Sequence, residues 1–556
     1  MATPLDQVRQ ALLDSRLSKD TQVSFGNSLS IIRILLDNGC CARCCLRYLG
    51  CTDFRLYALD ETDLFTYFDT LYTEKGNMES LTPPNGICTA CLGAIQYADS
   101  FVDDVCERLA KEDYKADSVC LTCTLPVSIL SRDHLMKVHV LNTLAAQNEV
   151  DLVRIWGGDK DVRDPKDFFK YLFGLGLTKK THLMLDSDAP LRMNVVVGHE
   201  PTSKEHLFLT ELKEPLLNVR TMRQKKIRVT VGDSRSCIVE ALKKLDSNEA
   251  KEVTAIPPVR PTEKAKFHTV DLLHVSSHVG GRYLKFSREY SQTPWAIKGQ
   301  KLAEHSVSDC FEDLIRKYHR ADSTKFVTAG REDANVRMLG TGRPFYLEII
   351  NPRTPRLTDA EYKAMEDEIN SNPIHKDNVQ VRHLGFINPA DTSIIKEGEE
   401  TKTKRYRALV WLSEPLTDDL IERINRIGSQ EFTIQQKTPV RVFQRRSAAI
   451  RPKIIHTSTI ARLNPNVDLS SPEACYGVLK LHTQAGTYIK EYVHGDLGRT
   501  LPNLASVGEI HSADLLELDV MDVDLVWPPV AVETEAVPMV IDESNENNKR
   551  AHTNVL

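Results

Sequence analysis

Along the first half of the chain, apolar residues recur three and four positions apart, which is the period of one helix face. This pattern predicts helices over residues 27–36 and 133–146. A further helix is predicted by the spacing of Ala98, Phe101, Val102, Val105 and Leu109. A strand near Val119, and the strand, turn and helix of KKIRVTVGDSRSCIVEALKKL, add a second kind of element. The first half therefore has the pattern of an α/β domain.

From His268 onward, strand-like stretches dominate instead. They include TVDLLHVSSHV, YLKFS, FYLEII, YRALVWL, VRVF and GVLKLHTQAG. Helical patterns over residues 359–369 and 417–427 separate some of these stretches. This mixture predicts an α+β fold for the second half, with a mainly antiparallel mixed sheet.

The segments between these patterns indicate where domains begin and end. Residues 249–264 are rich in proline and charge, which is typical of a linker. Residues 530–556 have few large apolar side chains and several acids. We expect an N-terminal accessory domain over 1–265, a second domain over 266–530 and a disordered acidic tail over 531–556. A chain of 556 residues is long enough for several domains.

Composition limits the function classes. No uninterrupted apolar run approaches the roughly 18 residues that a membrane span needs. The charged N-terminus lacks the apolar segment of a secretory signal, so we expect neither secretion nor a membrane partner. The formal net charge of −6 decides nothing about nucleic acid, because local charge matters more than the total. No localisation signal is visible, which leaves nucleus and cytoplasm both open.

The chain contains 13 cysteines, an odd number that favours reduced thiols or a metal over disulfides. The motifs CARC and CTACLG each place two cysteines with two residues between them, so that both thiolates can bind one metal ion. The ligands that we choose for a structural zinc ion are Cys41, Cys44, Cys88 and Cys91. Cys40, Cys45 and Cys51 compete for the first pair, so its register stays open.

Cys120 and Cys123, in SVCLTCTLP, have the same spacing. The alternation around them is that of a strand, in which residues three apart face opposite sides. We therefore interpret this pair as buried free cysteines rather than metal ligands.

Four parts of the second half combine cationic, aromatic and turn residues. They are GGRYLKFSREYSQTPW, FVTAGREDANVRMLGTGRPFYLEIINP, TKTKRYRALVWL, and KTPVRVFQRR with the later TQAGTYIKEYVHGDLGRT. Cationic side chains attract phosphates, and aromatic rings stack on unpaired bases. Any one stretch also fits an ordinary solvated strand edge, but four in one domain favour RNA or single-stranded nucleic acid as the partner.

The second of these stretches, residues 326–352, is the candidate catalytic segment. Asp333 follows a Gly-Arg turn that can lift it out of a strand end, although the alternative is an acid that caps the turn's own amides. His494 and Asp496 could suggest a hydrolase dyad, but no serine or cysteine nucleophile elbow accompanies them. Gly340 and Gly342 are too short a motif for a nucleotide fingerprint, so no organic cofactor is expected.

The motifs GREDANVRMLGTGRPF, EGEETKTKRYRALVWL, QKTPVRVFQRR and TQAGTYIKEYVHGDLGRT closely resemble the archaeal and eukaryotic tRNA pseudouridine synthases of the "Pus-ten" type. The resemblance covers residues 280–529 at motif level. CARC and CTACLG are similar to that family's zinc pairs, and the N-terminal half is more weakly similar to its accessory domain with a THUMP-like, RNA-binding part. The resemblance implies a pseudouridine synthase domain that isomerises one or two uridines in the T-arm of tRNA.

The resemblance also implies residue roles. Asp333 matches the essential acid of an Arg-x-Asp motif, Tyr406 the tyrosine that stacks on the target base, and Lys490 the basic residue that pairs with the aspartate. The family often has a second acid where this chain has Asn335, but comparison with the Arg-Thr-Asp turn of other pseudouridine synthases favours Asp333. The candidate RNA-binding residues, some of which are alternatively structural, are Arg282, Arg331, Arg337, Arg343, Arg441 and Arg499.

The chemistry agrees with these residue types. Cleavage of an N-glycosidic bond builds positive character at the sugar carbon, which an ionised carboxylate stabilises or captures. A neighbouring ammonium lowers the pKa of that carboxylate, and an aromatic ring offsets part of the cost of unstacking the base. We expect a monomer that acts on tRNA. Two other functions compete: a non-catalytic RNA-binding adaptor, for example for precursor microRNA, and a zinc-dependent protein-interaction module in the N-terminal half.

Overall fold

The protein forms two compact units in a computed structural model. The described residues are 3–15, 24–76, 79–147, 156, 162–224, 227–297, 299–444 and 446–529. Unit 1 comprises Met1–Ser276 with the short segments His319–Ser323 and Ile350–Pro355. Unit 2 comprises Ser277–Tyr318, Thr324–Ile349 and the chain from Arg356 onward. The acidic tail expected over 531–556 lies outside the described residues.

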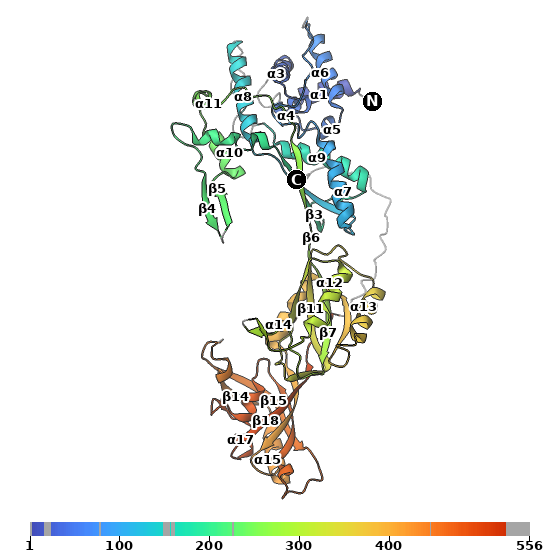
Figure 1. The fold of residues 1–556 in the computed structure, drawn as a ribbon, viewed down its shortest axis with the longest axis vertical. Helices are drawn as coiled ribbons and strands as arrows, with labels where there is room; N and C mark the ends of the chain where they lie inside the picture. Colours follow the sequence, from blue (N-terminus) through green and yellow to red (C-terminus); the bar gives the residue numbers. More distant parts are fainter. Residues whose placement is uncertain are drawn as a thin grey trace, which may run out of the picture. The chain divides into compact units, whose positions relative to one another are not determined.

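Unit 1 is built from helices around a small sheet (Figure 1). Its helices are α1 (Pro4–Leu13), α3 (Phe25–Asp37), α4 (Ala42–Tyr48), α5 (Phe54–Tyr57), α6 (Glu61–Glu74), α7 (Val102–Glu112), α8 (Ser128–Ala146), α9 (Pro165–Thr181), α10 (Arg235–Lys244) and α11 (Ser247–Val253). Its strands are β1 (Ser118–Thr124), β2 (Met184–Leu185), β3 (Leu191–Gly198), β4 (Arg220–Gln224), β5 (Ile227–Val231) and β6 (Lys266–His274).

Four of these strands form one sheet in the order β2-β1-β3-β6, with β1 parallel to β2 and β3, and β6 antiparallel to β3. Helix α9 packs on this sheet because it carries an apolar stripe that includes Phe169, Phe173 and Leu177, all fully buried. Asp164 caps its first turn and Pro165 occupies the first helical position, where a missing N–H costs nothing. Strands β4 and β5 form a separate hairpin.

The helices predicted over 27–36 and 133–146 are confirmed as α3 and α8. The stretch TVDLLHVSSHV, expected as one strand-like run, divides between β6 of unit 1 and β7 (Ser277–Lys285) of unit 2. The run divides because β6 pairs with β3 in the sheet of unit 1 and not with a strand of unit 2. The boundary between units therefore falls between Ser276 and Ser277, although the composition of the linker placed it at residue 265.

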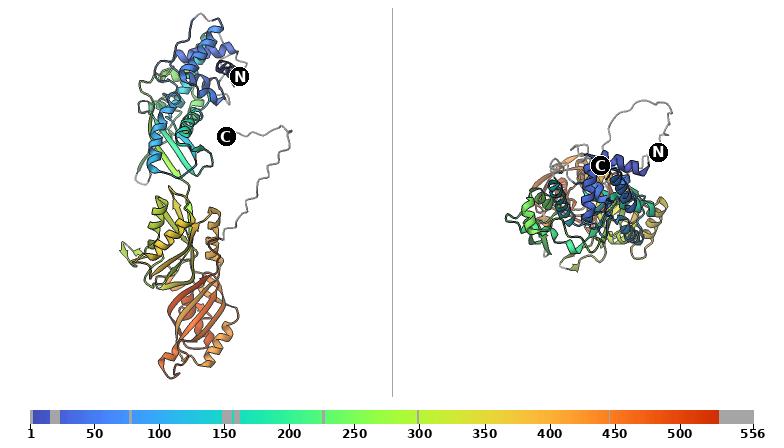
Figure 2. Two further views of the ribbon diagram at one scale, coloured as in Figure 1. Left: turned by 90° about the vertical axis from the view of Figure 1, so that its right-hand side faces the viewer. Right: turned by 90° about the horizontal axis from the view of Figure 1, so that it is seen from above.

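Unit 2 contains a large twisted sheet with helices against it (Figures 1 and 2). After β7, its strands are β8 (Ala296–Ile297), β9 (Gln300–Lys301), β10 (Ser323–Thr328), β11 (Val336–Ile350), β12 (Val379–Phe386), β13 (Lys404–Leu412), β14 (Phe432–Lys437), β15 (Ile450–Arg462), β16 (Tyr476–Thr483), β17 (Thr500–Leu501) and β18 (Ala513–Val523). Its helices are α12 (Glu312–His319), α13 (Asp359–Ser371), α14 (Thr392–Thr401), α15 (Asp418–Gly428), α16 (Ile489–His494) and α17 (Leu504–Gly508).

The sheet has ten strands, nine of them in the order β12-β7-β11-β18-β13-β16-β15-β14-β17, while β10 pairs with β11. Strands β12, β7 and β11 pair antiparallel, as do the strands from β18 to β17. The two groups meet where β11 and β18 pair in parallel. The expected α+β architecture with a mainly antiparallel mixed sheet is therefore present in this unit.

The junction between β11 and β18 depends on a close backbone approach. The register of β11 against β7 breaks between Met338 and Arg343. Within the break, Gly340 has φ +62°, and a Cβ there would lie 1.8 Å from the carbonyl oxygen of Met521 in β18. Only glycine fits this position without moving a strand. The loop before β11 consequently opens beside the junction of the two groups of strands.

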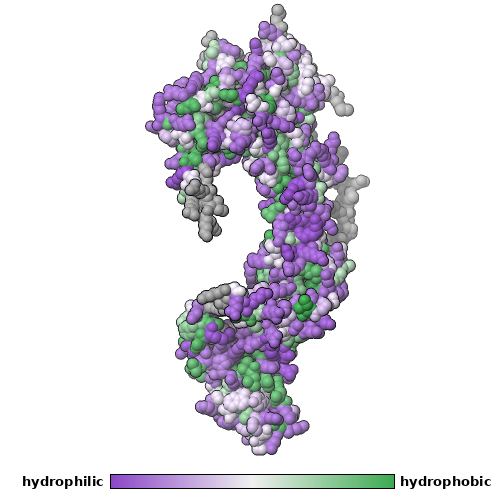
Figure 3. Space-filling view, in the orientation of Figure 1, coloured by the Kyte–Doolittle hydropathy of each residue, from purple (hydrophilic) through white to green (hydrophobic). Residues whose placement is uncertain are grey.

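No described helix is both long and apolar enough to cross a membrane. Figure 3 shows polar residues over most of the visible face of each unit, with apolar residues in smaller patches.

Candidate active site and candidate metal centre

A buried ion pair supports the candidate catalytic loop, which we define as residues 329–335. Arg343 Nε donates to Glu332 Oε2 at 2.7 Å, and the two side chains are 2% and 1% exposed. The Tyr283 hydroxyl donates to the same carboxylate at 2.9 Å, and Arg343 Nη1 donates to the carbonyl of Ala329 at 2.9 Å. Because buried charges are costly unless they are paired, these contacts fix the first half of the loop.

Lys285 of β7 anchors the second half of the loop. Its buried Nζ donates to the carbonyl oxygens of Tyr290 at 2.8 Å, Asp333 at 3.3 Å and Ala334 at 2.7 Å. Burial lowers the pKa of Lys285 to about 8. The backbone on both sides of the Asp333 side chain is thus held by groups that belong to β7 and β11.

The Asp333 side chain projects from this fixed backbone and is 50% exposed. Lys490 Nζ donates to Asp333 Oδ2 at 2.9 Å and to Asn335 Oδ1 at 3.4 Å, and Arg441 Nη1 lies 3.5 Å from the same Asp333 oxygen. Burial alone would raise the pKa of Asp333. The hydrogen bond and charge of Lys490, with the charges of Arg441 and Arg331, outweigh it and lower this pKa. The carboxylate is therefore ionised at neutral pH.

Lys490 reaches Asp333 from helix α16, 157 residues further along the chain. On this helix Tyr492 and Val493 are fully buried, and the Tyr492 hydroxyl lies 2.9 Å from Ser458 Oγ of β15. The helix ends at Gly495, which has φ +77° and forms a left-handed cap. This anchoring turns Lys490 toward the loop.

Tyr406 lies on β13, opposite Leu481 of β16 and Val520 of β18. Arg343, which supports the loop, also acts electrostatically on the Tyr406 phenol. Burial raises the pKa of Tyr406 to about 12. The phenol is therefore neutral at neutral pH.

Three of the six candidate RNA-binding arginines are engaged within the protein. Arg282 is 6% exposed and donates to Gly342 O at 2.9 Å and Leu525 O at 2.9 Å. Arg343 forms the buried pair already described, and Arg337 binds both carboxylate oxygens of Asp519, at 2.8 and 2.7 Å. These contacts favour the structural alternative for this group.

The other three arginines are more accessible. Arg331 is exposed and Arg441 is 44% exposed beside Asp333. Arg499 is 24% exposed, stacks over the Phe443 ring at 4.8 Å and donates to Thr438 O at 2.7 Å. An RNA contact by these residues remains a prediction.

Sequence reasoning missed the supporting residues Glu332, Tyr283 and Lys285. Glu332 and Asp333 are adjacent acids in one motif, and neighbouring residues of an extended chain face opposite sides. That alternation indicates that one acid points inward, but only the position of Arg343 identifies it as Glu332.

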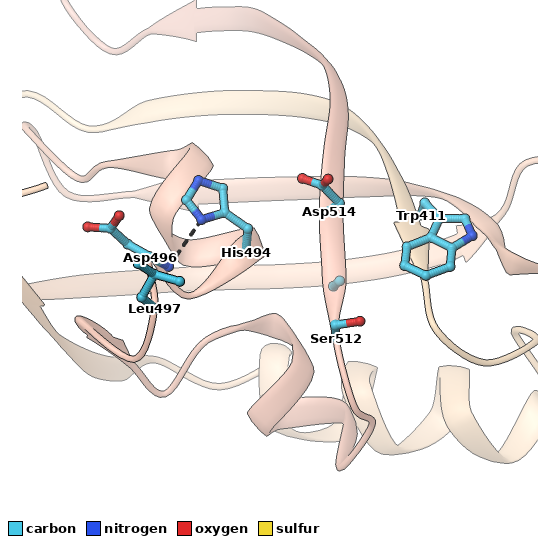
Figure 4. Close-up of a pocket in the computed structure, with 7 residues that line it drawn as sticks. Trp411, His494, Asp496, Leu497, Ser512 and Asp514 are labelled. Carbon is cyan, nitrogen blue, oxygen red and sulfur yellow. Dashed lines mark hydrogen bonds between the residues drawn. The ribbon is translucent and has the colours of Figure 1, made fainter. Parts of the chain in front are cut away.

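A shallow pocket of about 420 Å³ surrounds the HGD motif (Figure 4). Its lining residues are Trp411, His494, Asp496, Leu497, Ser512, Ala513 and Asp514. His494 Nδ1 accepts the backbone N–H of Asp496 at 3.1 Å, while the Asp496 carboxylate lies 3.5 Å from Arg499 and accepts from the Val440 amide at 3.3 Å. The described contacts of the Asp496 carboxylate are therefore to groups other than the imidazole ring, so His494 and Asp496 do not form a hydrolase dyad.

The structure gathers four buried cysteines in unit 1: Cys41, Cys44, Cys88 and Cys91. Their sulfur atoms all lie within 4.8 Å of one another. The backbone amides of Cys41 and Cys91 donate to Cys88 Sγ at 3.2 and 3.5 Å, as amides do around a thiolate that binds a metal. Cys40 and Cys45 are buried but are not part of this group. Four sulfur donors at such separations fit one tetrahedral metal ion.

Comparison with known proteins defines the class to which this arrangement belongs. The chain is 31% identical over 534 residues to a tRNA pseudouridine synthase of Xenopus laevis, which covers 90% of this chain and 98% of the relative. It is 30% identical over 542 residues to a tRNA pseudouridine synthase of Homo sapiens, with 90% and 97% covered. The protein is therefore a homologue of the tRNA pseudouridine synthases.

The family models are more specific. A model of the C-terminal region of Pus10 matches residues 278–524, and a model of the N-terminal region of eukaryotic Pus10 matches residues 88–272. The chain belongs to the Pus10 family, which confirms the resemblance seen in its motifs. The two matches meet at the boundary between unit 1 and unit 2.

More distant comparisons cover less of the chain. The Pus10 of Methanopyrus kandleri is 34% identical over 257 residues, with 44% of this chain and 55% of the relative covered. A solved Cbf5-Nop10-Gar1 complex is similar at 14% identity over 43% of this chain and 47% of that chain, with a TM-score of 0.23, which is too low to carry an argument.

Proposed function

We propose that this protein isomerises uridine to pseudouridine in the T-arm of tRNA, with Asp333 as the catalytic carboxylate. The observation that carries the proposal is the pair of Asp333 and Lys490, joined at 2.9 Å across 157 residues. The acid is ionised, half exposed and held on a rigid loop. A flipped nucleotide can therefore reach it without the loop having to move.

In this proposal, each site residue has one task. Asp333 stabilises or captures the sugar carbon as the N-glycosidic bond breaks, the base turns, and it rejoins the sugar through carbon. Lys490 keeps the carboxylate ionised and oriented. Tyr406 offers its ring to the unstacked base. The reaction is an isomerisation, so reactant and product contain the same atoms and neither a redox partner nor a group donor is consumed.

The proposal is tested by incubating the protein with an unmodified tRNA transcript and mapping pseudouridine. We expect product in the T-arm with the wild type and none with Asp333→Asn, while both bind the transcript equally. Arg423→Gln is a matched control, since the described contacts of Arg423 are to Glu509, at 3.4 Å, and to the carbonyl of Gly508 and include no residue of the loop. A fully active Asp333→Asn variant would end the assignment. Tight binding without product in the wild type would favour the adaptor function instead.

We further propose that the four-cysteine group binds one structural zinc ion. Zinc accepts four thiolates in tetrahedral geometry, and such an ion contributes directly to folding. Cys91→Ser is expected to lose one equivalent of zinc and to destabilise unit 1, while Cys120→Ser, outside the group, keeps the metal. Full zinc content in Cys91→Ser would refute the ligand set.

We also propose that unit 1 contains a THUMP-like, RNA-binding part. The supporting feature is the β4–β5 hairpin, which extends from α10 in Figure 1. No acid occurs between Glu214 and Asp233, whereas this interval contains five cationic residues. Two of these cationic residues, Arg223 and Arg228, occupy opposite positions in the backbone register of the hairpin, and cationic residues attract the phosphates of RNA.

The test is a filter-binding titration of tRNA at several salt concentrations. Arg223→Gln with Arg228→Gln is expected to weaken binding and to reduce the salt slope by about two. The control is Arg108→Gln with Lys180→Gln, whose cations pair with acids of the same unit. Equal affinities and slopes for the two double variants would contradict an RNA contact by the hairpin.

A further inference from the structure

Arg441 lies in the segment that connects β14 with β15, within the short helical turn Val440–Val442. The neighbouring side chains of this turn point outward, with Val440 53% and Phe443 44% exposed. Arg441 is 44% exposed as well, but its Nη1 lies 3.5 Å from Asp333 Oδ2. The turn itself is held at Thr438, whose amide donates to Ala449 O at 2.9 Å.

The partner that accounts for this orientation is Glu491, the residue after Lys490 on α16. Its side chain is 2% exposed, and its Oε1 accepts from Arg441 Nε at 2.7 Å. Its second oxygen, Oε2, is buried and has no hydrogen-bond partner among the described residues. A buried carboxylate is costly without a cation, so Glu491 constrains Arg441 strongly.

The helix that carries Glu491 is itself rigid where it begins. Buried Gln436 donates from Nε2 to Tyr488 O at 2.9 Å and accepts the Tyr488 amide at 2.9 Å. The Arg441 guanidinium also lies over the Tyr488 ring, 5.9 Å from its centre. Apart from Asp333, the groups that the Arg441 guanidinium contacts are thus Glu491 of α16 and Tyr488, the residue before this helix, which Gln436 of β14 holds in place.

We propose that Glu491 is a positioning residue that holds Arg441 beside Asp333, so that two cations rather than one orient the catalytic carboxylate. Helix α16 would then serve the aspartate twice: directly through Lys490 and indirectly through Glu491 and Arg441. This inference rests on the proposed function, because it assigns Arg441 to the acid of that reaction. The competing role is the one expected from sequence, in which Arg441 binds an RNA phosphate.

The two roles predict different kinetics. A cation that orients Asp333 affects the rate of the chemical step when all tRNA is bound, with little effect on affinity. A cation that binds a phosphate affects affinity, and its loss reduces the salt slope of binding by about one. The single-turnover rate at saturating enzyme and the dissociation constant of tRNA therefore separate them.

The experiment compares Arg441→Gln, Glu491→Gln and the double variant with the wild type. Arg441→Gln is expected to lower the single-turnover rate by about tenfold or more, to leave tRNA affinity nearly unchanged, and to lower the melting temperature because Glu491 is left unpaired. The double variant is expected to regain the melting temperature, since no buried charge remains, but not the rate. Glu491→Gln alone is expected to slow the reaction without weakening binding.

Two results would overturn the inference. One is a double variant as fast as the wild type, which would show that the Arg441 charge does not act on Asp333. The other is an unchanged rate in Arg441→Gln with weaker, less salt-dependent binding, which would assign Arg441 to a phosphate. Arg423→Gln with Glu509→Gln is the control, an exposed pair of the same unit that should alter neither quantity. A wild type that makes no pseudouridine would instead refute the proposed function. The melting temperatures of the variants would still show whether Glu491 depends on Arg441.

Discussion

Glu332 and Asp333 are adjacent acids, yet we expect their replacement by the corresponding amides to affect different properties of the protein. Glu332→Gln removes the charge that compensates Arg343 inside unit 2, where the two side chains are 1% and 2% exposed. Asp333→Asn removes a half-exposed carboxylate whose ammonium partner, Lys490, is 23% exposed. The first change is therefore expected to act on stability and the second on catalysis.

The magnitudes follow from burial. Breaking a buried ion pair by removing one partner costs about 3–5 kcal/mol, whereas a surface pair contributes about 0–1 kcal/mol. For a unit of this size, 1 kcal/mol shifts the melting temperature by about 2–4 °C. Glu332→Gln is thus expected to lower the melting temperature of unit 2 by about 6–20 °C. Asp333→Asn is expected to lower it by less than about 4 °C.

The assay combines thermal melts with hydrogen exchange, because two units need not unfold together. Peptides from β7 and β11 report on the elements that carry Tyr283 and Arg343. Pseudouridine formation is measured below the melting temperature of each variant. Glu332→Gln is expected to retain some activity there, because Asp333, Lys490 and Tyr406 are intact, and Asp333→Asn is expected to retain none.

A third variant makes the reasoning refutable. Replacing both partners, with Glu332→Gln and Arg343→Met, removes the unpaired charge and should recover much of the lost stability. If this double variant is less stable than Glu332→Gln alone, the uncompensated charge of Arg343 is not the source of the loss. If Glu332→Gln melts with the wild type, the buried pair does not hold the loop.

Substitutions at three further positions test other parts of the site. Lys490→Ala is expected to lower the single-turnover rate by more than about tenfold while tRNA affinity changes little; a defect in affinity alone would indicate a phosphate contact. Tyr406→Phe keeps the ring and should keep most of the single-turnover rate. Tyr406→Leu should lower this rate by about 5- to 150-fold, since stacking contributes roughly 1–3 kcal/mol per base. Equal rates for the two variants would contradict stacking. Lys285→Met removes the donor to the carbonyls of Asp333 and Ala334 and should increase hydrogen exchange in the candidate catalytic loop and slow the reaction; unchanged exchange would show that the loop does not depend on this anchor.

Local patterns were sufficient for much of the fold and for the candidate residues. The helices α3 and α8 follow from apolar spacing, which a helix needs in order to bury one face. The sequence motifs led to the choice of the four cysteines that cluster in unit 1, because a two-residue spacer brings each pair together locally, although the sequence left the register of the first pair open. The Pus10 family was also recognisable from four motifs. Each of these inferences depends on residues that are near one another in the chain.

Tertiary structure decided the relations between distant segments. The order of strands in the second sheet brings Lys490 to Asp333 across 157 residues, and Glu491 and Arg441 meet in the same place. The separation of β6 from β7 depends on which strand each one pairs with.

The sequence by itself therefore determined which residue types the segment 326–352 offers, including two adjacent acids and three arginines. Only the folded chain decided which acid is buried and which is open to a substrate. The physical reason is that burial is not a property of a short motif. It depends on what packs against the motif, and here that is Arg343, Tyr283 and Lys285 from two paired strands.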